Sequence, residues 1–222
     1  MPKPLRLLSV VGFVGVAAFL VGFPAVKLAI TPPTVTATTT PGQANLTLQT
    51  VGAIGYGPHP TWVSYLVQDG SGKWIHSTLW KLPAHSTIHV TIWQYDSAGP
   101  LRNFVWGGVT GVNGGAEYAN GVRTTLSNPD GNNAPGHTFT VPQLGINVPL
   151  IGVQTAKNDC DIAAPCTPNF AHVKITFTFQ TGAAGLIRWQ CFVPCALGYL
   201  DGNGGPMSTV GYMGGFLDVV NA

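Results

Sequence analysis

The chain has 222 residues, including 29 Gly and 18 Pro but only 10 basic and 8 acidic residues, and its formal net charge is +2. No basic run follows the N-terminal segment, which excludes the clustered positive charge that nucleic-acid binding needs. Gly and Pro separate segments rich in Val, Ile, Thr, Phe and Trp, a composition typical of short strands joined by many turns, so it predicts an all-β domain.

The N-terminal segment begins with basic residues and continues, from Leu7 to Val26, with twenty uncharged residues. About twenty apolar residues in an α-helix span the hydrocarbon layer of a membrane. The basic flank predicts that the N-terminus stays inside and that the rest of the chain is outside the cytoplasm. Residues 1–30 are therefore predicted to be an anchor with one transmembrane helix in the cell membrane. A cleaved signal peptide is the alternative.

Residues 31–43 are rich in Thr and Pro and are expected to form an extended stalk that buries nothing. The body, residues 44–222, begins with segments of alternating apolar and polar residues, which predict strands at 45–54, 61–67, 73–82 and 88–93. Residues 101–133 are rich in Gly and Asn and too long for a plain loop, so we expect an insertion with its own hairpin.

The second half of the body continues the pattern, with strands predicted at 137–153, 173–180 and 186–191. No segment after residue 30 shows a helical period over ten or more residues, so the prediction is a β-sandwich of seven to nine strands. The loop between the first two of these strands contains Cys160 and Cys166. Four cysteines allow three pairings, and a local Cys160–Cys166 disulfide is the simplest of them in an exported domain.

Several passages resemble the cupredoxin family, and more narrowly the copper domain of cytochrome c oxidase subunit II. Residues 82–96 resemble the family's turn, strand and acidic-ended loop, although His85 stands where the family usually has Gly. Residues 137–145 resemble the strand that carries the first ligand. Residues 191–198 resemble the double-cysteine ligand loop, and residues 213–219 resemble the closing strand headed by Met. The resemblance implies a cupredoxin-like Greek-key β-sandwich.

The resemblance also implies a copper site with four ligands and two weaker candidates: His137, Cys191, Cys195 and Met213, then Met207 and Tyr199. The sequence departs from the family at Tyr199, which stands where the second histidine belongs, and an insertion near residues 200–210 follows it. A phenol must lose a proton with a pKa of about 10 before it binds a metal well. We therefore expect a degenerate, sulfur-rich site that suits Cu(I).

A second interpretation of Cys191 and Cys195 is a disulfide across their loop, which oxidising surroundings favour. The domain would then be a metal-free binding or assembly module, or a structural surface protein, that has lost the copper site. The sequence contains no nucleophile elbow, phosphate-binding loop or carboxylate pair, so we expect at most a non-catalytic redox subunit. The interpretation we favour is a membrane-anchored copper-binding or electron-transfer protein, whose partner is an oxidase catalytic subunit or another redox protein.

Overall fold

The computed structural model describes residues 12, 15–16, 32–99, 101, 103–127, 133–154, 159–160, 163–195 and 205–221. The chain divides into two compact units, Met1–Thr31 and Pro32–Ala222, and the features below belong to the second unit. Apart from three helical residues, the predicted anchor lies outside the described residues. In the part of the chain that the structure describes, no helix has both the length and the apolar character needed to cross a membrane.

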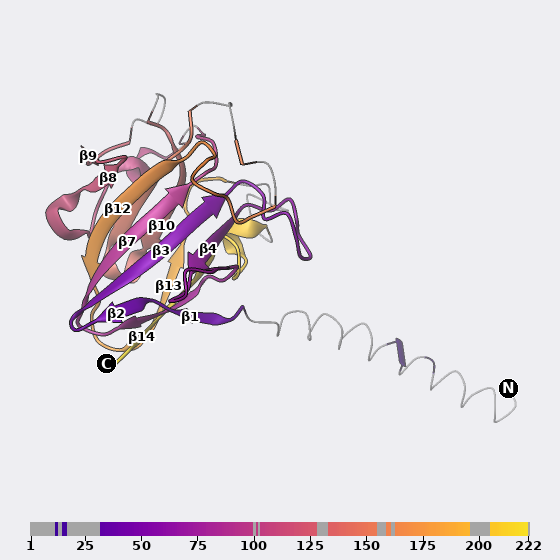
Figure 1. Cartoon of the computed structure of the whole chain (residues 1–222), viewed down its shortest axis with the longest axis horizontal. Helices are drawn as coiled ribbons and strands as arrows, with labels where there is room; N and C mark the ends of the chain where they lie inside the picture. Colours follow the sequence, from indigo (N-terminus) through magenta and orange to yellow (C-terminus); the bar gives the residue numbers. More distant parts are fainter. Residues whose placement is uncertain are drawn as a thin grey trace, which may run out of the picture. The chain divides into compact units, whose positions relative to one another are not determined.

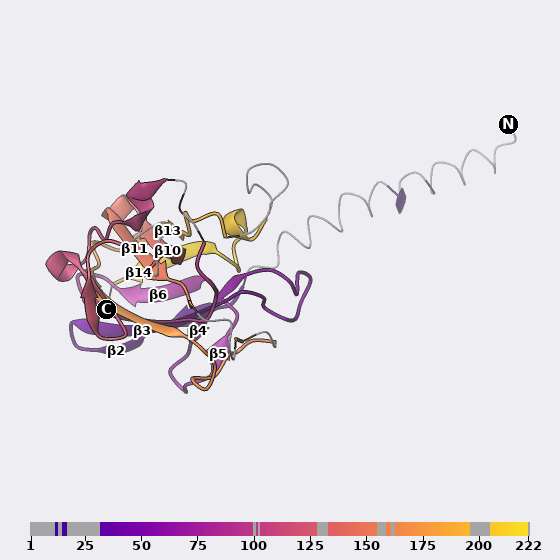
Figure 2. The ribbon, with the colours of Figure 1, turned by 90° about the horizontal axis from the view of Figure 1, so that it is seen from above.

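The described residues of the second unit form two β-sheets that stack as the layers of a sandwich (Figures 1 and 2). The first sheet contains six strands in the order β1 (Thr34–Thr36), β6 (Leu79–Pro83), β14 (Gly214–Val220), β13 (Gly185–Gln190), β10 (Pro135–Val141) and β11 (Ile146–Ile151). The second sheet contains eight strands in the order β5 (Trp74–Ile75), β4 (Ser64–Gln68), β3 (Gln43–Val51), β7 (Thr87–Gln94), β12 (Val173–Gln180), β8 (Glu117–Ala119) and β9 (Val122–Thr124), with β2 (Thr38–Thr40) paired to β3. The predicted all-β sandwich is confirmed.

The prediction of seven to nine strands was too low, because turns divide two segments that were expected as single strands and because residues 34–40 add β1 and β2. The segment 73–82 forms β5 and β6, which belong to different sheets. The segment 137–153 forms β10 and β11, separated by the short 3-10 helix η3 (Pro142–Leu144). Gly145 ends η3 with a φ of 65°, a left-handed conformation that glycine adopts at no steric cost, so the chain reverses there.

The predicted stalk at residues 31–43 is corrected by the structure. β1 pairs in parallel with β6, and β2 pairs antiparallel with β3. Val35 and Ala37 are buried in the main core. Threonine is β-branched and fits a pleated strand, and the apolar residues at 35 and 37 alternate with it in the two-residue period of a strand. The Thr-rich segment therefore forms strands of the sandwich.

Stacked aromatic rings fill the core between the two sheets. Trp80 and Trp189 stack with ring centroids 4.4 Å apart, and Phe139 lies beside both rings. All three are fully buried, and the Trp189 indole nitrogen donates a hydrogen bond to the Thr78 carbonyl at 3.1 Å. Trp189 lies on β13, two residues before Cys191. The packing of this ring therefore fixes where the cysteine loop begins.

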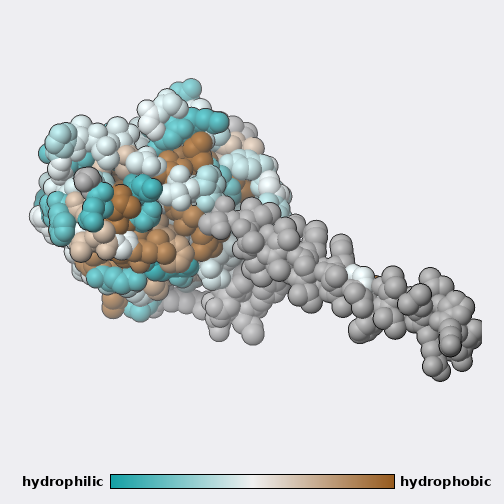
Figure 3. Space-filling view, turned by 90° about the horizontal axis from the view of Figure 1, so that it is seen from below, coloured by the Kyte–Doolittle hydropathy of each residue, from teal (hydrophilic) through white to brown (hydrophobic). Residues whose placement is uncertain are grey.

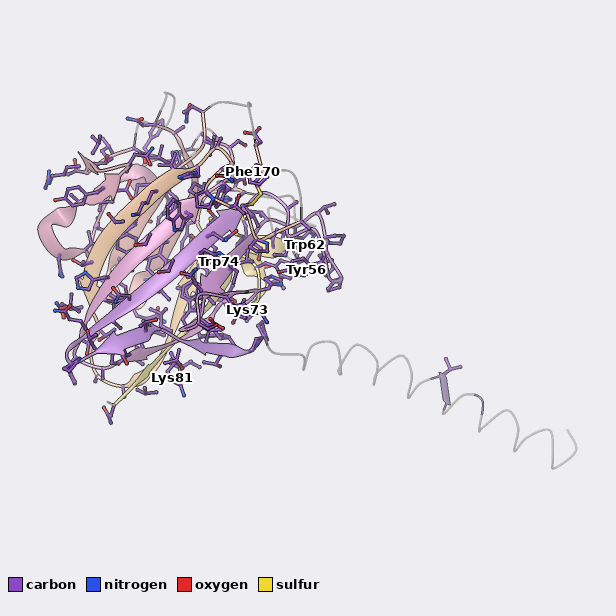
Figure 4. All side chains as sticks on the ribbon, viewed as in Figure 1. Tyr56, Trp62, Lys73, Trp74, Lys81 and Phe170 are labelled. Atoms are coloured by element: carbon purple, nitrogen blue, oxygen red, sulfur yellow. A yellow bond between two sulfur atoms is a disulfide. The ribbon has the colours of Figure 1, made fainter. Side chains whose placement is uncertain are left out.

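A smaller apolar cluster includes Val51 of β3 and Leu66 of β4 in the second sheet, and Trp62, Trp74 and Phe170 pack against it (Figure 4). Cys160 and Cys166 belong to the same cluster and are joined in a disulfide, the local pairing expected from the sequence. The surface combines apolar patches with hydrophilic ones (Figure 3), as expected for a chain with few charged residues.

The predicted insertion at 101–133 is described for most of its length. It contains the short 3-10 helices η1 (Phe104–Gly107) and η2 (Asn113–Gly115), followed by β8 and β9, which pair as an antiparallel hairpin. β8 also pairs with β12, so the hairpin extends the second sheet at its edge. The insertion therefore adds two strands to the sandwich and brings η1 toward the first sheet.

Candidate metal centre

Side chains of three residues with metal-binding atoms converge where β10 and β13 lie side by side in the first sheet. His137 lies in β10, Cys191 directly follows β13, and Cys195 is four residues further along. Their ligand atoms all lie within 4.8 Å of one another. No other group of three His, Cys, Asp or Glu side chains comes together in this way in the described part of the chain.

The distances within this group suit a single metal ion better than a covalent bond. The two sulfur atoms are 3.5 Å apart, and the Cys191 sulfur is 4.0 Å from Nδ1 of His137. A disulfide needs sulfur atoms about 2.05 Å apart, so both cysteines are free thiols in this structure. An ion that binds sulfur at about 2.3 Å and nitrogen at about 2.1 Å keeps its ligand atoms roughly 3.5 to 4 Å apart. The two distances from the Cys191 sulfur fall in this range, and the whole group lies within 4.8 Å.

Asp96 orients the imidazole of His137. It follows β7, and its Oδ2 lies 3.0 Å from His137 Nε2. Because a carboxylate can only accept, Nε2 carries the hydrogen, and in the neutral ring Nδ1 has its lone pair on the side of the sulfur atoms. Asp96 was not among the site residues expected from the sequence. The available signal was its position at the acidic end of the loop in residues 82–96.

The pKa values of the group are shifted in opposite directions by these contacts. Burial alone would lower the pKa of His137, but hydrogen bonds to Asp96 and Cys191 outweigh it and raise that pKa to about 9. Burial also disfavours the Cys191 thiolate, but hydrogen bonds from Cys195, His137 and Thr138 lower the pKa of Cys191 well below its usual value. The hydrogen bond to Cys191, together with burial, raises the pKa of Cys195. These contacts thus favour the thiolate at Cys191 over the thiolate at Cys195, and the thiolate is the form of cysteine that binds metals.

The start of β14 adjoins the cysteine loop. The Met213 carbonyl accepts a hydrogen bond from the Cys191 backbone N–H at 2.9 Å, and both side chains are buried in the same core. Met207 is partly buried in η4 (Pro206–Ser208), the segment just before β14. Tyr199 and residues 200–204 of the predicted insertion lie outside the described residues. Of the two methionines, Met213 is the one held next to a candidate ligand by a hydrogen bond.

Two further residues, which were not among the expected ligands, support the site. The Thr138 backbone N–H donates to the Cys191 sulfur at 3.4 Å, and the Thr138 hydroxyl accepts a hydrogen bond from the Phe192 N–H at 2.8 Å. The Tyr65 hydroxyl, from β4 in the opposite sheet, donates to the Thr138 carbonyl at 3.0 Å. Burial raises the pKa of Tyr65 well above 10, so its hydroxyl remains a donor.

No known protein-family profile matches the sequence, and no curated protein is significantly similar to it. Several solved structures of rusticyanin resemble the chain. One is described as the copper protein rusticyanin, with a TM-score of 0.35 and 14% identity over 89% of this chain and 94% of that chain. A methionine-to-leucine variant of rusticyanin gives a TM-score of 0.36 and 15% identity over 86% and 84%. Rusticyanin from Thiobacillus ferrooxidans gives a TM-score of 0.31 and 14% identity over 90% and 94%.

Proposed function

We propose that this protein is a cupredoxin-like copper-binding protein that takes part in electron transfer. The observation that carries the proposal is the convergence of His137 Nδ1 and the sulfur atoms of Cys191 and Cys195 within 4.8 Å. One imidazole and two cysteine sulfurs form a soft donor set, which suits copper and Cu(I) in particular. Bound copper would supply a one-electron redox couple.

The residues of the chain would contribute orientation, exclusion of water and proton release. His137 and Cys191 are fully buried, and Asp96 fixes the orientation of the ring. Because β10 and the end of β13 hold these groups before any ion arrives, a change in the charge of the centre would require little movement of the protein. Metal binding would displace the protons of Cys195 and of His137 Nδ1, so copper affinity should fall in acid.

We propose a mononuclear centre for this site. A binuclear purple site needs a histidine for each copper, and the described residues bring one histidine to the sulfur atoms. Met213 is our candidate for a weak additional ligand, since its backbone is bonded to Cys191. The degenerate site expected from the resemblance to oxidase subunit II fits this proposal.

We further propose that the domain is anchored at the cell membrane and functions outside the cytoplasm, with an oxidase catalytic subunit or another redox protein as its partner. Support comes from the basic N-terminal flank and the twenty uncharged residues that follow it. Fractionation of cells that express the full chain tests this arrangement. Membrane-bound protein that external protease degrades is the expected result, and protein in the cytoplasmic fraction contradicts it.

Copper titration of the reduced, purified chain tests the main proposal. We expect one bound copper per chain by elemental analysis and, with Cu(II), a thiolate-to-copper absorption band that Cys191→Ser abolishes. Cys160→Ser with Cys166→Ser is the matched control, since neither cysteine belongs to the His137–Cys191–Cys195 group and the double variant should leave the band in place. The absence of copper uptake while Cys191 and Cys195 are free thiols would refute the proposal. A Cys191–Cys195 disulfide that excludes copper would favour the metal-free module.

A further inference from the structure

The insertion at residues 101–127 contacts the cysteine loop directly. Trp106 of η1 stacks on Phe192, with ring centroids 4.4 Å apart and an interplanar angle of 13°. Phe192 directly follows Cys191 and therefore lies between the two cysteines. Trp106 and Cys195 are both partly buried against the main core. The stack thus places η1 against the loop that carries both sulfur atoms.

A chain of partly and fully buried hydrogen bonds leads from the same loop into the first sheet. The Phe192 N–H donates to the Thr138 hydroxyl at 2.8 Å, and the hydroxyls of Thr138 and Thr140 are 2.9 Å apart. The Thr140 hydroxyl donates to Asn147 Oδ1 at 2.7 Å. Each hydroxyl has one hydrogen, so the hydrogen of Thr140 points to Asn147 and Thr138 donates to Thr140. The chain therefore runs in one direction, and each of its hydroxyls has both a donor and an acceptor.

Asn147 connects this chain of hydrogen bonds back to the insertion. Its Nδ2 donates to the carbonyls of Trp106 at 3.1 Å and Gly108 at 2.7 Å, which uses both hydrogens of the amide. Thr110 and Asn147 also exchange two backbone hydrogen bonds, at 2.9 and 3.1 Å. These contacts form a closed circuit. It runs from the Trp106 ring to the Phe192 ring, continues through Thr138, Thr140 and Asn147, and returns to Trp106. Loosening any member of such a circuit loosens the loop, since buried polar groups without partners are costly.

We propose that Trp106 and Asn147 are positioning residues that hold the Cys191–Cys195 loop closed against the candidate metal centre. The role of these two residues toward copper rests on the proposed function. The contacts that hold the loop do not require a metal. The circuit anchors the loop at Phe192, the residue next to the buried sulfur. It thereby keeps the two thiols 3.5 Å apart and keeps small molecules in solution away from Cys191.

Alkylation of the reduced, metal-free chain by iodoacetamide, followed by mass spectrometry of the cysteine peptides, tests the stack. We expect Trp106→Ala to increase the alkylation rate of the loop cysteines about tenfold, because loss of the stack makes local opening easier. Trp106→Phe keeps an aromatic ring and should restore a rate near that of the wild type. Trp74→Ala is the matched control, since Trp74 packs against the smaller cluster of the second sheet, and it should leave the rate unchanged.

The hydrogen-bond chain is tested in the same assay with Thr140→Val, which keeps the shape of the side chain and removes the hydroxyl. The alkylation rate should rise, and Thr140→Ser should restore it. Unchanged rates in both Trp106→Ala and Thr140→Val would overturn the proposal. Equal acceleration by Trp74→Ala would also overturn it, because the effect would then be general destabilisation.

A second readout uses the copper-loaded chain. Trp106→Ala should shift and broaden the thiolate-to-copper absorption band, while Trp74→Ala should not, because only the former loosens the geometry around the sulfur atoms. An identical band in Trp106→Ala and the wild type would contradict the positioning role. If the wild type takes up no copper, the proposed function fails, and the alkylation experiment still decides whether the circuit holds the loop.

Discussion

Asp96 and His137 form a pair in which one residue sets the chemistry of the other. The carboxylate accepts from Nε2 at 3.0 Å, which leaves Nδ1 to face the Cys191 sulfur. Hydrogen bonds from His137 and Ser97 keep the pKa of Asp96 below its usual value although burial alone would raise it, so Asp96 is ionised at neutral pH. An ionised acceptor behind a metal-binding imidazole holds the ring in place and makes it more basic.

We therefore expect Asp96→Asn to lower copper affinity about 10- to 100-fold, since outer-shell partners of ligating histidines typically have effects of this size. Competition with a chelator of known affinity measures it. Asp218→Asn is the control, because Asp218 forms a partly exposed ion pair with Lys81 and lies on β14 away from His137. Equal affinities of Asp96→Asn and the wild type would show that the pair does not orient the ring.

Some residues of the site could be predicted from the sequence, and others could not, for a physical reason. His137, Cys191 and Cys195 were identifiable because a local motif surrounds each of them. Asp96 and Tyr65 reach the centre only through folding, from the end of β7 and from β4 in the second sheet. The acidic end of the loop in residues 82–96 is a weak signal for Asp96, and nothing near Tyr65 in the sequence marks its contact. His85 departs from the glycine of the resembling family, and its φ of 50° is the left-handed conformation that glycine adopts most easily.

At the scale of elements, β14 passes very close to the chain that leads into β6. The Thr78 carbonyl accepts hydrogen bonds from the Phe216 N–H at 3.0 Å and from the Trp189 indole at 3.1 Å. A Cβ added to Gly215 would lie 1.8 Å from the same carbonyl oxygen. Glycine is therefore required where β14 and β13 meet Thr78, and this contact ties three strands of the first sheet together.

Gly215→Ala should accordingly destabilise the domain by about 3 kcal/mol, because the strands must separate to admit the methyl group. Urea unfolding of the metal-free chain measures the change. Gly185→Ala on β13 is the matched control, since a Cβ there meets no atom within 4 Å. The idea fails if the two variants have the same stability.

Sequence periodicity recovered elements where one residue in two is buried along an unbroken strand. β12 has the predicted bounds, since its apolar and polar residues alternate from Val173 to Gln180. The strands β1 and β2 were missed because each has only three residues, and their pairing with β6 and β3 is decided by partners far away in the sequence. Local pattern predicts strands well, but it does not predict which short segments find a partner.

At the scale of the whole molecule, one carboxyl group makes stability depend on pH. Glu117 on β8 is fully buried, and neither of its carboxyl oxygens has a hydrogen-bond partner among the described residues. Burial raises the pKa of Glu117 well above 4.5. The folded chain therefore retains a proton that the unfolded chain releases. Below pH 4.5 both states are protonated, and this group then adds no pH dependence to the stability.

As the pH rises above 4.5, the folding equilibrium should weaken by up to about tenfold per pH unit, until the pH passes the pKa of Glu117 in the folded state. Glu117→Gln has a similar shape and no titration, so its advantage over the wild type should grow with pH across this window. Thermal unfolding of both metal-free proteins between pH 4 and 8 measures the difference. A difference that stays constant over this range would show that Glu117 titrates normally.

The parallel pairing of β1 with β6 has a mechanical consequence. The chain enters the described domain at Pro32, and the first ladder it forms joins the three residues Thr34–Thr36 to Leu79, Trp80 and Lys81. Tension applied through the N-terminal end would thus load this short edge ladder before any other. The next strand, β2, is bonded to the opposite layer, so a pull that detached β1 would pass to the second sheet. Two strand ladders, one in each sheet, would therefore resist force from that end in succession.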